Sequence, residues 1–73
     1  MSADGNKLYQ KTEVVGTSEV SFEDAIARAL ERARRTIHHV RWFEVVEQRG
    51  RVDDGRIEFQ ITLEIGSEVE ESP

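Results

Sequence analysis

The sequence predicts an α+β fold in the order β-α-β-β, in which a three-stranded antiparallel sheet packs on one amphipathic helix. Three observations support this fold class. Apolar and polar residues alternate along residues 56–65, which is typical of a half-buried strand. Apolar residues recur every three or four positions between Phe22 and His39, which is typical of a helix lying on a sheet. A chain of 73 residues has room for one domain at most.

The helix is expected from Phe22 to about His39. Ser21 is a good N-cap because its hydroxyl can accept from the backbone N–H of Asp24, and the Asp24 carboxylate is expected to reach back as a shortened capping box. Acid–base pairs spaced four residues apart lie on the polar face, namely Asp24 with Arg28 and Glu31 with Arg35. Small side chains on the apolar stripe would let the helix lie close to the sheet, namely Ala25, Ala29 and Ala33.

Three strands are expected around the helix. The first covers residues 7–15 and is followed by a break at residues 16–18; the second covers residues 41–51; the third covers residues 56–65 after a hairpin turn at residues 53–55. Strict alternation places one mixed set of side chains on the face away from the helix, namely Trp42, Glu44, Val46, Gln48, Gln60 and Thr62. Such a mixture suits a subunit interface or a ligand site.

The expected organisation is a flexible N-terminus at residues 1–6, a single domain at residues 7–66 and an acidic tail at residues 67–73. The chain has no cysteine, so disulfides and thiolate zinc sites are excluded. A core of this size supplies little net stability on its own. Association with other subunits is therefore the expected source of additional stability.

The charge balance restricts the partners. The chain has 15 Asp and Glu residues against 10 Lys and Arg residues, a net charge of −5. This charge argues against nucleic acid and against an anionic membrane surface. No apolar run indicates a secretory signal or a membrane span. The expected compartment is the cytoplasm.

Neither catalysis nor metal binding is favoured by the residues. Ser18 and Ser21 lack a positioned base, and no glycine-rich phosphate loop is present. His38 and His39 are expected at the end of the helix, where they would interact favourably with the helix dipole. Metal ligation is the weaker interpretation, because adjacent side chains on a helix point about 100° apart.

Trp42 and Gln60 are the two candidate ligand residues. Trp42 is the only tryptophan, and it either fills a subunit interface or offers its indole face for stacking on a planar heteroaromatic ring. Gln60 is either an ordinary strand residue or a donor and acceptor for the polar edge of a flavin or a base. The residues alone leave both alternatives open.

Several short motifs resemble those of the dodecin family. They are Val14–Ser18 before the capped helix, Ala25–Ile26 and Arg32–Thr36 on the helix, Trp42–Val45 on the second strand and Phe59–Gln60 on the third. The resemblance covers about residues 7–66, nearly all of the chain that is expected to be ordered. The order and spacing of the motifs make the match specific.

The resemblance implies a β-α-β-β subunit in a hollow homododecamer that stores flavin, as FMN or riboflavin. Flavins would bind in pairs at two-fold axes between tryptophans, with Trp42 as the stacking residue and Gln60 at the polar edge of the ring. The resemblance also assigns subunit contacts, or the flavin side chain and phosphate, to a second group, namely Lys7, Tyr9 and Arg49. The stacked indole would quench the excited flavin without net chemistry, so no enzymatic activity is expected.

Two alternatives remain beside flavin storage. In the first, the chain is a structural oligomeric module and the Trp42 face is only a subunit contact. In the second, a flavin-dependent enzyme uses the same pocket. The chain also departs from some bacterial relatives, which carry an aromatic and a basic residue where this sequence has Ser67 and Glu68. Phe43 favours the bacterial branch over the halophilic archaeal type.

Overall fold

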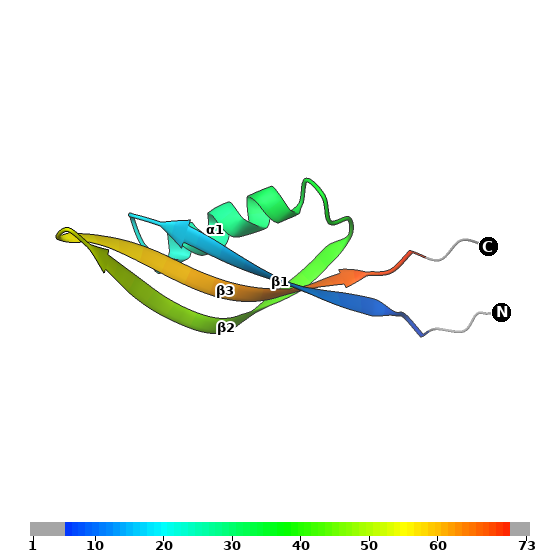
Figure 1. Cartoon of the computed structure of the whole chain (residues 1–73). Coiled ribbons are helices and arrows are strands. Elements are labelled where there is room, and N and C mark those ends of the chain that lie inside the picture. Colours follow the sequence, from blue (N-terminus) through cyan, green and yellow to red (C-terminus); the bar gives the residue numbers. More distant parts are fainter. Residues whose placement is uncertain (1–5, 71–73) are drawn as a thin grey trace.

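The structure, a computed structural model, describes residues 6–70 and confirms the predicted β-α-β-β fold (Figure 1). Its elements are β1 (Tyr9–Ser18), α1 (Phe22–Ala33), β2 (Val40–Asp53) and β3 (Arg56–Glu68). The sheet has the order β1-β3-β2, and both pairs of neighbouring strands are antiparallel. Residues 1–5 of the expected N-terminal segment and residues 71–73 of the expected acidic tail lie outside the described residues, whereas residues 67–68 belong to β3.

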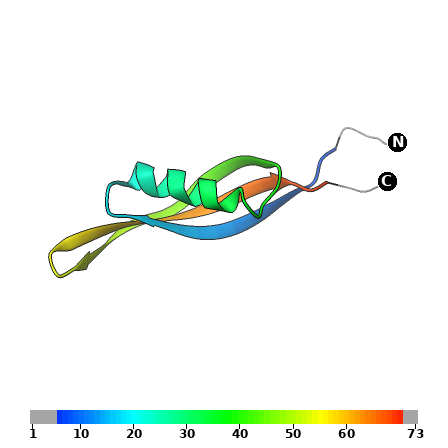
Figure 2. The ribbon, with the colours of Figure 1, turned by 90° about the horizontal axis from the view of Figure 1, so that it is seen from above.

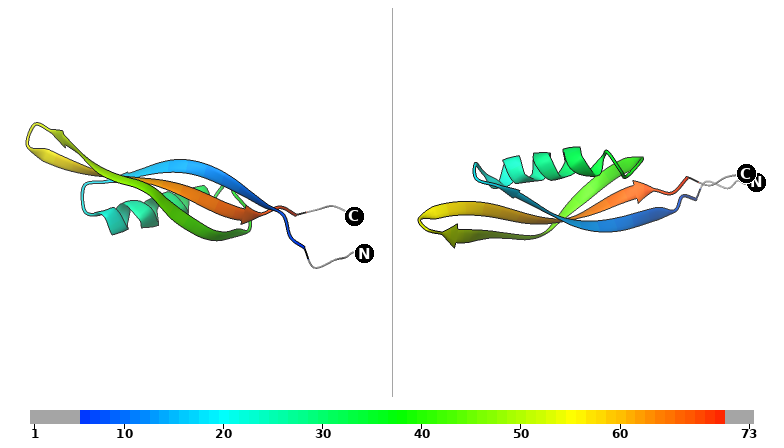
Figure 3. Two further views of the ribbon diagram at one scale, coloured as in Figure 1. Left: turned by 90° about the horizontal axis from the view of Figure 1, so that it is seen from below. Right: turned by 45° about the horizontal axis from the view of Figure 1, so that its top comes forward.

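Helix α1 covers one face of the sheet, and the β2–β3 hairpin extends past the start of the helix (Figures 2 and 3). The radius of gyration is 15.6 Å, whereas a compact chain of this length has a radius of about 11 Å. The hairpin turns at Asp54 and Gly55, whose φ angles of 52° and 78° fit a tight two-residue turn. The shape leaves much of the sheet without a covering layer.

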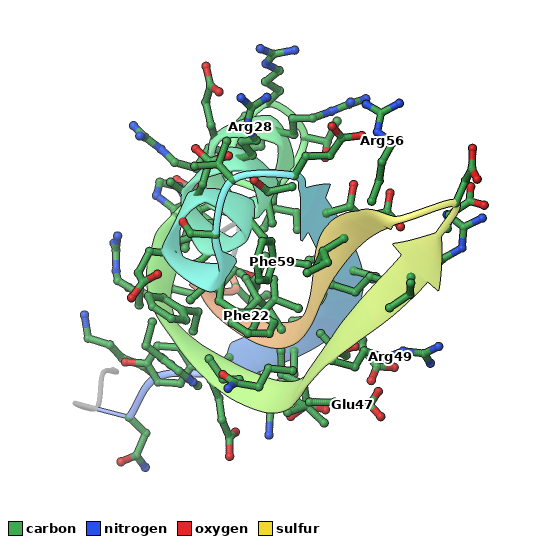
Figure 4. All side chains as sticks on the ribbon, turned by 90° about the vertical axis from the view of Figure 1, so that its left-hand side faces the viewer. Phe22, Arg28, Glu47, Arg49, Arg56 and Phe59 are labelled. Atoms are coloured by element: carbon green, nitrogen blue, oxygen red, sulfur yellow. The ribbon has the colours of Figure 1, made fainter. Side chains whose placement is uncertain are left out.

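The core is small and is centred on β3. Ile61, Leu63 and Ile65 are fully buried beneath α1, because β3 is the central strand and has a neighbour on each side. The helix contributes Ala25 and Ala33 to this buried cluster. The rings of Phe22 and Phe59 close one end of the core with an edge-to-face contact at 5.0 Å, and Figure 4 shows both rings between helix and sheet.

Strand β1 continues through Gly16 to Ser18, so the predicted break at residues 16–18 was wrong. Gly16 pairs with Ile61, and a Cβ atom added at Gly16 would lie 2.7 Å from both the Ala25 carbonyl oxygen and the Ala29 Cβ. The glycine interrupts no strand; its missing side chain lets the helix lie directly on β1. The expected close approach of the alanine stripe is confirmed at this contact.

The N-cap prediction is confirmed for Ser21, whose hydroxyl accepts from Asp24 N at 2.9 Å. The expected capping box is not formed, because the Asp24 carboxylate accepts from Ser18 Oγ at 2.6 Å and from Arg28 Nε at 2.6 Å. These two donors hold the pKa of Asp24 below its usual value. The predicted pair of Glu31 with Arg35 is also present.

Helix α1 ends at Ala33, six residues before the predicted end at His39. The amides of Thr36 and Ile37 both donate to the Ala33 carbonyl, which closes the helix in a turn, and His39 has a left-handed φ of 61°. His38 and His39 therefore lie in the connection to β2, and the expected interaction with the helix end does not apply. No helix among residues 6–70 is long and apolar enough to cross a membrane.

Strand β2 contains two register shifts, one between Val40 and Trp42 and one between Val45 and Glu47. Residues directly opposite each other in an antiparallel pair point to the same face of the sheet. The second shift therefore turns Gln48 toward the helix face, opposite Ile61. The prediction that Gln48 shares a face with Trp42 was wrong, because strict alternation fails at a bulge.

Candidate functional site

The sheet face away from α1, called the outer face here, carries an exposed aromatic group at one end. Trp42 lies opposite Gly66 of β3, and the residue is 39% exposed. A Cβ atom added at Gly66 would lie 2.5 Å from Trp42 Cδ2 and closer still to Cε2 and Cζ2. The indole therefore lies across the backbone of Gly66, in space that only a glycine leaves free.

Tyr9 supports the indole from the other side of β3. Its ring centroid is 5.0 Å from that of Trp42, with an angle of 67° between the rings. Such an edge-to-face arrangement is a favourable aromatic geometry. Trp42, Tyr9 and Gly66 together form what is called the Trp42 platform below, with one residue from each strand.

Sequence reasoning missed Gly66, because the third strand was expected to end at Ile65, one residue before it. β3 continues to Glu68, so Gly66 is inside the strand and not after it. A glycine inside a strand often marks the close approach of another group. The residues after Gly66 are mostly polar, so residues 67–73 were interpreted as a tail.

Charged residues surround the platform. Glu68 Oε2 accepts from Lys7 Nζ at 3.3 Å, and Glu68 Oε1 accepts from Arg41 Nε at 3.1 Å. These cations hold the pKa of Glu68 below its usual value, with Lys7 as the larger cause. Lys7, which the resemblance assigned to contacts or to the flavin, is thus engaged by a carboxylate within its own chain.

Three carboxylates, Glu13, Glu64 and Glu44, lie side by side across the strands next to the platform. Lys11 Nζ lies 2.8 Å from Glu64 and 3.9 Å from Glu44, and the bond to Glu64 raises the pKa of Lys11. The lysine thereby relieves the repulsion between like charges that face each other on neighbouring strands. Among the described residues, no group of three or more metal-ligating side chains is placed to hold a metal ion.

Gln60 lies on the outer face at the other end of the sheet, directly opposite Arg49. Its Nε2 donates to Glu58 Oε1 at 2.9 Å, and its carbonyl oxygen completes a donor and acceptor pair in one side chain. Arg49 is exposed and, in Figure 4, projects from the sheet on the side opposite the helix. An amide beside a cation is a combination suited to a polar ring edge and an anionic substituent.

The predicted ligand residues thus form two groups. Lys7 and Tyr9 lie with Trp42, whereas Arg49 lies with Gln60. Gly66, the partner of Trp42, is six positions from Gln60 along β3, which is about 20 Å at about 3.3 Å per residue. A three-ring planar ligand is shorter than this distance. The sequence correctly placed Trp42 and Gln60 on one face, and the structure shows that they lie toward opposite ends of that face.

The chain matches the dodecin family model over residues 8–70. It is 49% identical over 67 residues to a dodecin of Thermus thermophilus, an alignment that covers 90% of this chain and 97% of that protein. It is 39% identical over 59 residues to the calcium dodecin of Mycobacterium tuberculosis, which covers 80% and 83% respectively.

Solved structures show the same fold. The dodecin of Streptomyces coelicolor superposes with a TM-score of 0.88 at 40% identity, covering 94% of this chain and 100% of that chain. The crystal structure of the calcium-chelating calcium dodecin of Mycobacterium tuberculosis has a TM-score of 0.80 at 36% identity, covering 90% and 96%. The family model spans most of the chain, and the relatives are matched over most of their length. The resemblance is thereby confirmed, and the chain belongs to the dodecin family.

Proposed function

We propose that this chain is a flavin-storage protein. It binds FMN or riboflavin in pairs between the subunits of a homododecamer, and it quenches the excited state of the bound flavin. The observation that carries the proposal is the exposed indole of Trp42, held over Gly66 and braced by Tyr9. The dodecin family, whose members are binding and storage proteins, supports a binding role. We place this role in the cytoplasm.

The platform fits a flat aromatic ligand. An indole that is fixed before binding loses little conformational freedom when a ring stacks on it. Stacking of a planar ring on an aromatic side chain contributes about 1–3 kcal/mol. A two-fold axis would present the same platform twice, so that two stacked ligands fill the space between two indoles.

The distance between Trp42 and Gln60 supports a site shared between chains. One subunit would supply the indole face, and another would supply the amide of Gln60 with Arg49 beside it. The amide matches the alternating donors and acceptors at the polar edge of a flavin, and the guanidinium matches a phosphate. A bound flavin would supply a ring that absorbs light. The indole of Trp42 would donate an electron to the excited ring and take it back, so that the energy is dissipated without net chemistry.

Assembly is supported by the large apolar side chains that a single chain leaves exposed. Only five apolar residues form the buried core, while many others lie at the surface among the described residues. The most exposed of them are Leu8, Val15, Val20, Val52 and Ile57. A core of this size is marginal for an isolated chain, and contacts between subunits would cover the remaining apolar surface.

The Trp42 test is a fluorescence titration of the assembled apoprotein with riboflavin and with FMN. Trp42→Ala should weaken binding about 5- to 150-fold, the loss of one stacking contact, and should remove most of the quenching. Trp42→Phe should retain more affinity but quench less, because benzene is a poorer electron donor than indole. Phe43→Leu is the matched control, since it changes the next aromatic residue on the opposite face of β2.

The Gln60 test separates a ligand contact from a subunit contact. Gln60→Leu leaves the polar edge of the flavin unpaired, which costs about 1–3 kcal/mol and lowers affinity about 5- to 150-fold. Gln48→Leu is the control, because the bulge in β2 turns this second glutamine to the other face. Unchanged affinity in Gln60→Leu with altered melting of the apo-oligomer would make the face a structural interface only. A parallel titration with calcium alone tests the ligand named for the mycobacterial relative.

A further inference from the structure

We propose that Glu68 is the positioning residue of the Trp42 platform, because its carboxylate links the two strands that carry Tyr9 and Trp42. Glu68 lies near the end of β3, directly opposite Tyr9. The inference concerns the arrangement of the aromatic residues, and its ligand-binding consequence rests on the proposed function.

The two cations bound by Glu68 are close in sequence to the two aromatic residues. Lys7 lies two positions before Tyr9, and Arg41 immediately precedes Trp42. The carboxylate receives Lys7 Nζ at 3.3 Å on one oxygen and Arg41 Nε at 3.1 Å on the other. One side chain on the central strand therefore joins both segments that carry the rings.

The contact with Arg41 fixes an irregular part of β2. Arg41 lies in the register shift between Val40 and Trp42. A bulge redirects the side chains around it, so its conformation decides where the next residue points. The backbone amide of Glu68 also donates to the His39 carbonyl at 3.0 Å. This hydrogen bond holds the segment just before β2 against the end of β3.

The neighbouring charged groups have other partners. His39 Nε2 lies 3.3 Å from Glu70 Oε1, and Lys11 lies against Glu64 and Glu44. Glu68 is therefore the carboxylate that Lys7 and Arg41 share among the described residues. Glu70 is an exposed carboxylate nearby that provides a matched control.

The test compares Glu68→Gln with Glu70→Gln in the full-length, assembled protein. Near-ultraviolet circular dichroism of the apoprotein reports the environment of the single tryptophan without any ligand. We expect Glu68→Gln to reduce this signal and Glu70→Gln to leave it unchanged. A loosened indole must be immobilised again on binding, so riboflavin affinity should fall about two- to tenfold.

The acid dependence gives a readout that simple packing would not change. The pKa of Glu68 is lowered in the folded chain. The contacts of its carboxylate with Lys7 and Arg41 are therefore fully present at a pH above the usual pKa of a glutamate, and they are lost as the pH falls through the lowered pKa. The circular dichroism signal of the parent should follow this titration, and Glu68→Gln should lack this component of the change. Glu70→Gln should retain it, which separates Glu68 from the contact between His39 and Glu70.

Three results would overturn the inference. The first is an unchanged tryptophan signal in an assembled Glu68→Gln protein. The second is a gain in affinity for FMN that exceeds the gain for riboflavin, which would assign Glu68 to repulsion of the phosphate. If Glu68→Gln does not assemble, Arg41→Gln takes its place and should reduce the same tryptophan signal. The third result is an unchanged tryptophan signal in Arg41→Gln. A parent protein that binds no flavin would refute the proposed function, while the circular dichroism of the apoprotein would still decide the role of Glu68.

Discussion

Replacing Gly66 with alanine is the most direct perturbation of the Trp42 platform. The new Cβ atom would lie 2.5 Å from Trp42 Cδ2 and closer to two other ring atoms, whereas carbon atoms in contact lie about 3.5–4.0 Å apart. The indole must therefore move by about 1 Å or more. Trp42 is a 39% exposed residue on the outer face, so its indole can turn outward without disturbing the buried core. We therefore expect the site to be lost while the fold is retained.

The expected loss of flavin affinity in Gly66→Ala is about 5- to 150-fold, which corresponds to the stacking contribution of about 1–3 kcal/mol. The assay combines a flavin fluorescence titration, near-ultraviolet circular dichroism and a thermal melt of the apo-oligomer. Gly50→Ala is the control, because the nearest atom to its new Cβ is the Glu58 carbonyl oxygen at 3.9 Å. The control should preserve both flavin affinity and the tryptophan signal.

A double-mutant cycle makes the Gly66 prediction specific. In a Trp42→Ala background the indole is absent, so the added methyl group of Gly66→Ala meets no ring and should have little further effect on flavin affinity. Equal losses in the two backgrounds would show that alanine acts on the strand itself. An unchanged tryptophan signal in Gly66→Ala would refute the position of the indole over this glycine.

Two further predictions concern the fold. Gly16→Ala should lower the free energy of unfolding by about 1–3 kcal/mol, as overpacking does, because the added Cβ atom would lie 2.7 Å from the Ala25 carbonyl oxygen. A chemical denaturation curve equal to that of the parent would contradict the close packing of α1 on β1. Asp24 should contribute stability that is present above its usual pKa and lost as the pH falls through its lowered pKa, since Ser18 and Arg28 bind the charged form. Melting temperatures across acid pH check this, and Asp24→Asn should lack that component; an identical acid profile would reject the assignment.

Local patterns in the sequence predicted the elements where short-range chemistry decides them. The hydroxyl of Ser21, directly before the helix, accepts from the amide of Asp24 three residues later. Alternation along residues 56–65 defines the strand that carries the buried Ile61, Leu63 and Ile65. The motifs around Trp42 and Gln60 were sufficient to identify the family. Alternation along the second and third strands placed both residues on the outer face.

The boundaries that were wrong depend on contacts between distant segments. From the sequence alone, Gly16 was interpreted as a break between elements, but it lies inside β1, where its missing side chain makes room for α1. The stripe that continues to Ile37 predicts a longer helix, yet the chain turns after Ala33 to enter β2. Packing against the sheet overrides local propensity at both places.

The sequence by itself determined the order of the elements, the buried face of β3 and the family, because these depend on residue type and spacing. Only the tertiary structure decided which side chains meet. The bulges in β2 turn Gln48 to the helix face and bring Trp42 over Gly66, and the pairing of β3 with both neighbours places Glu68 between Lys7 and Arg41. Strand register is a property of two segments together, so neither segment alone specifies these contacts.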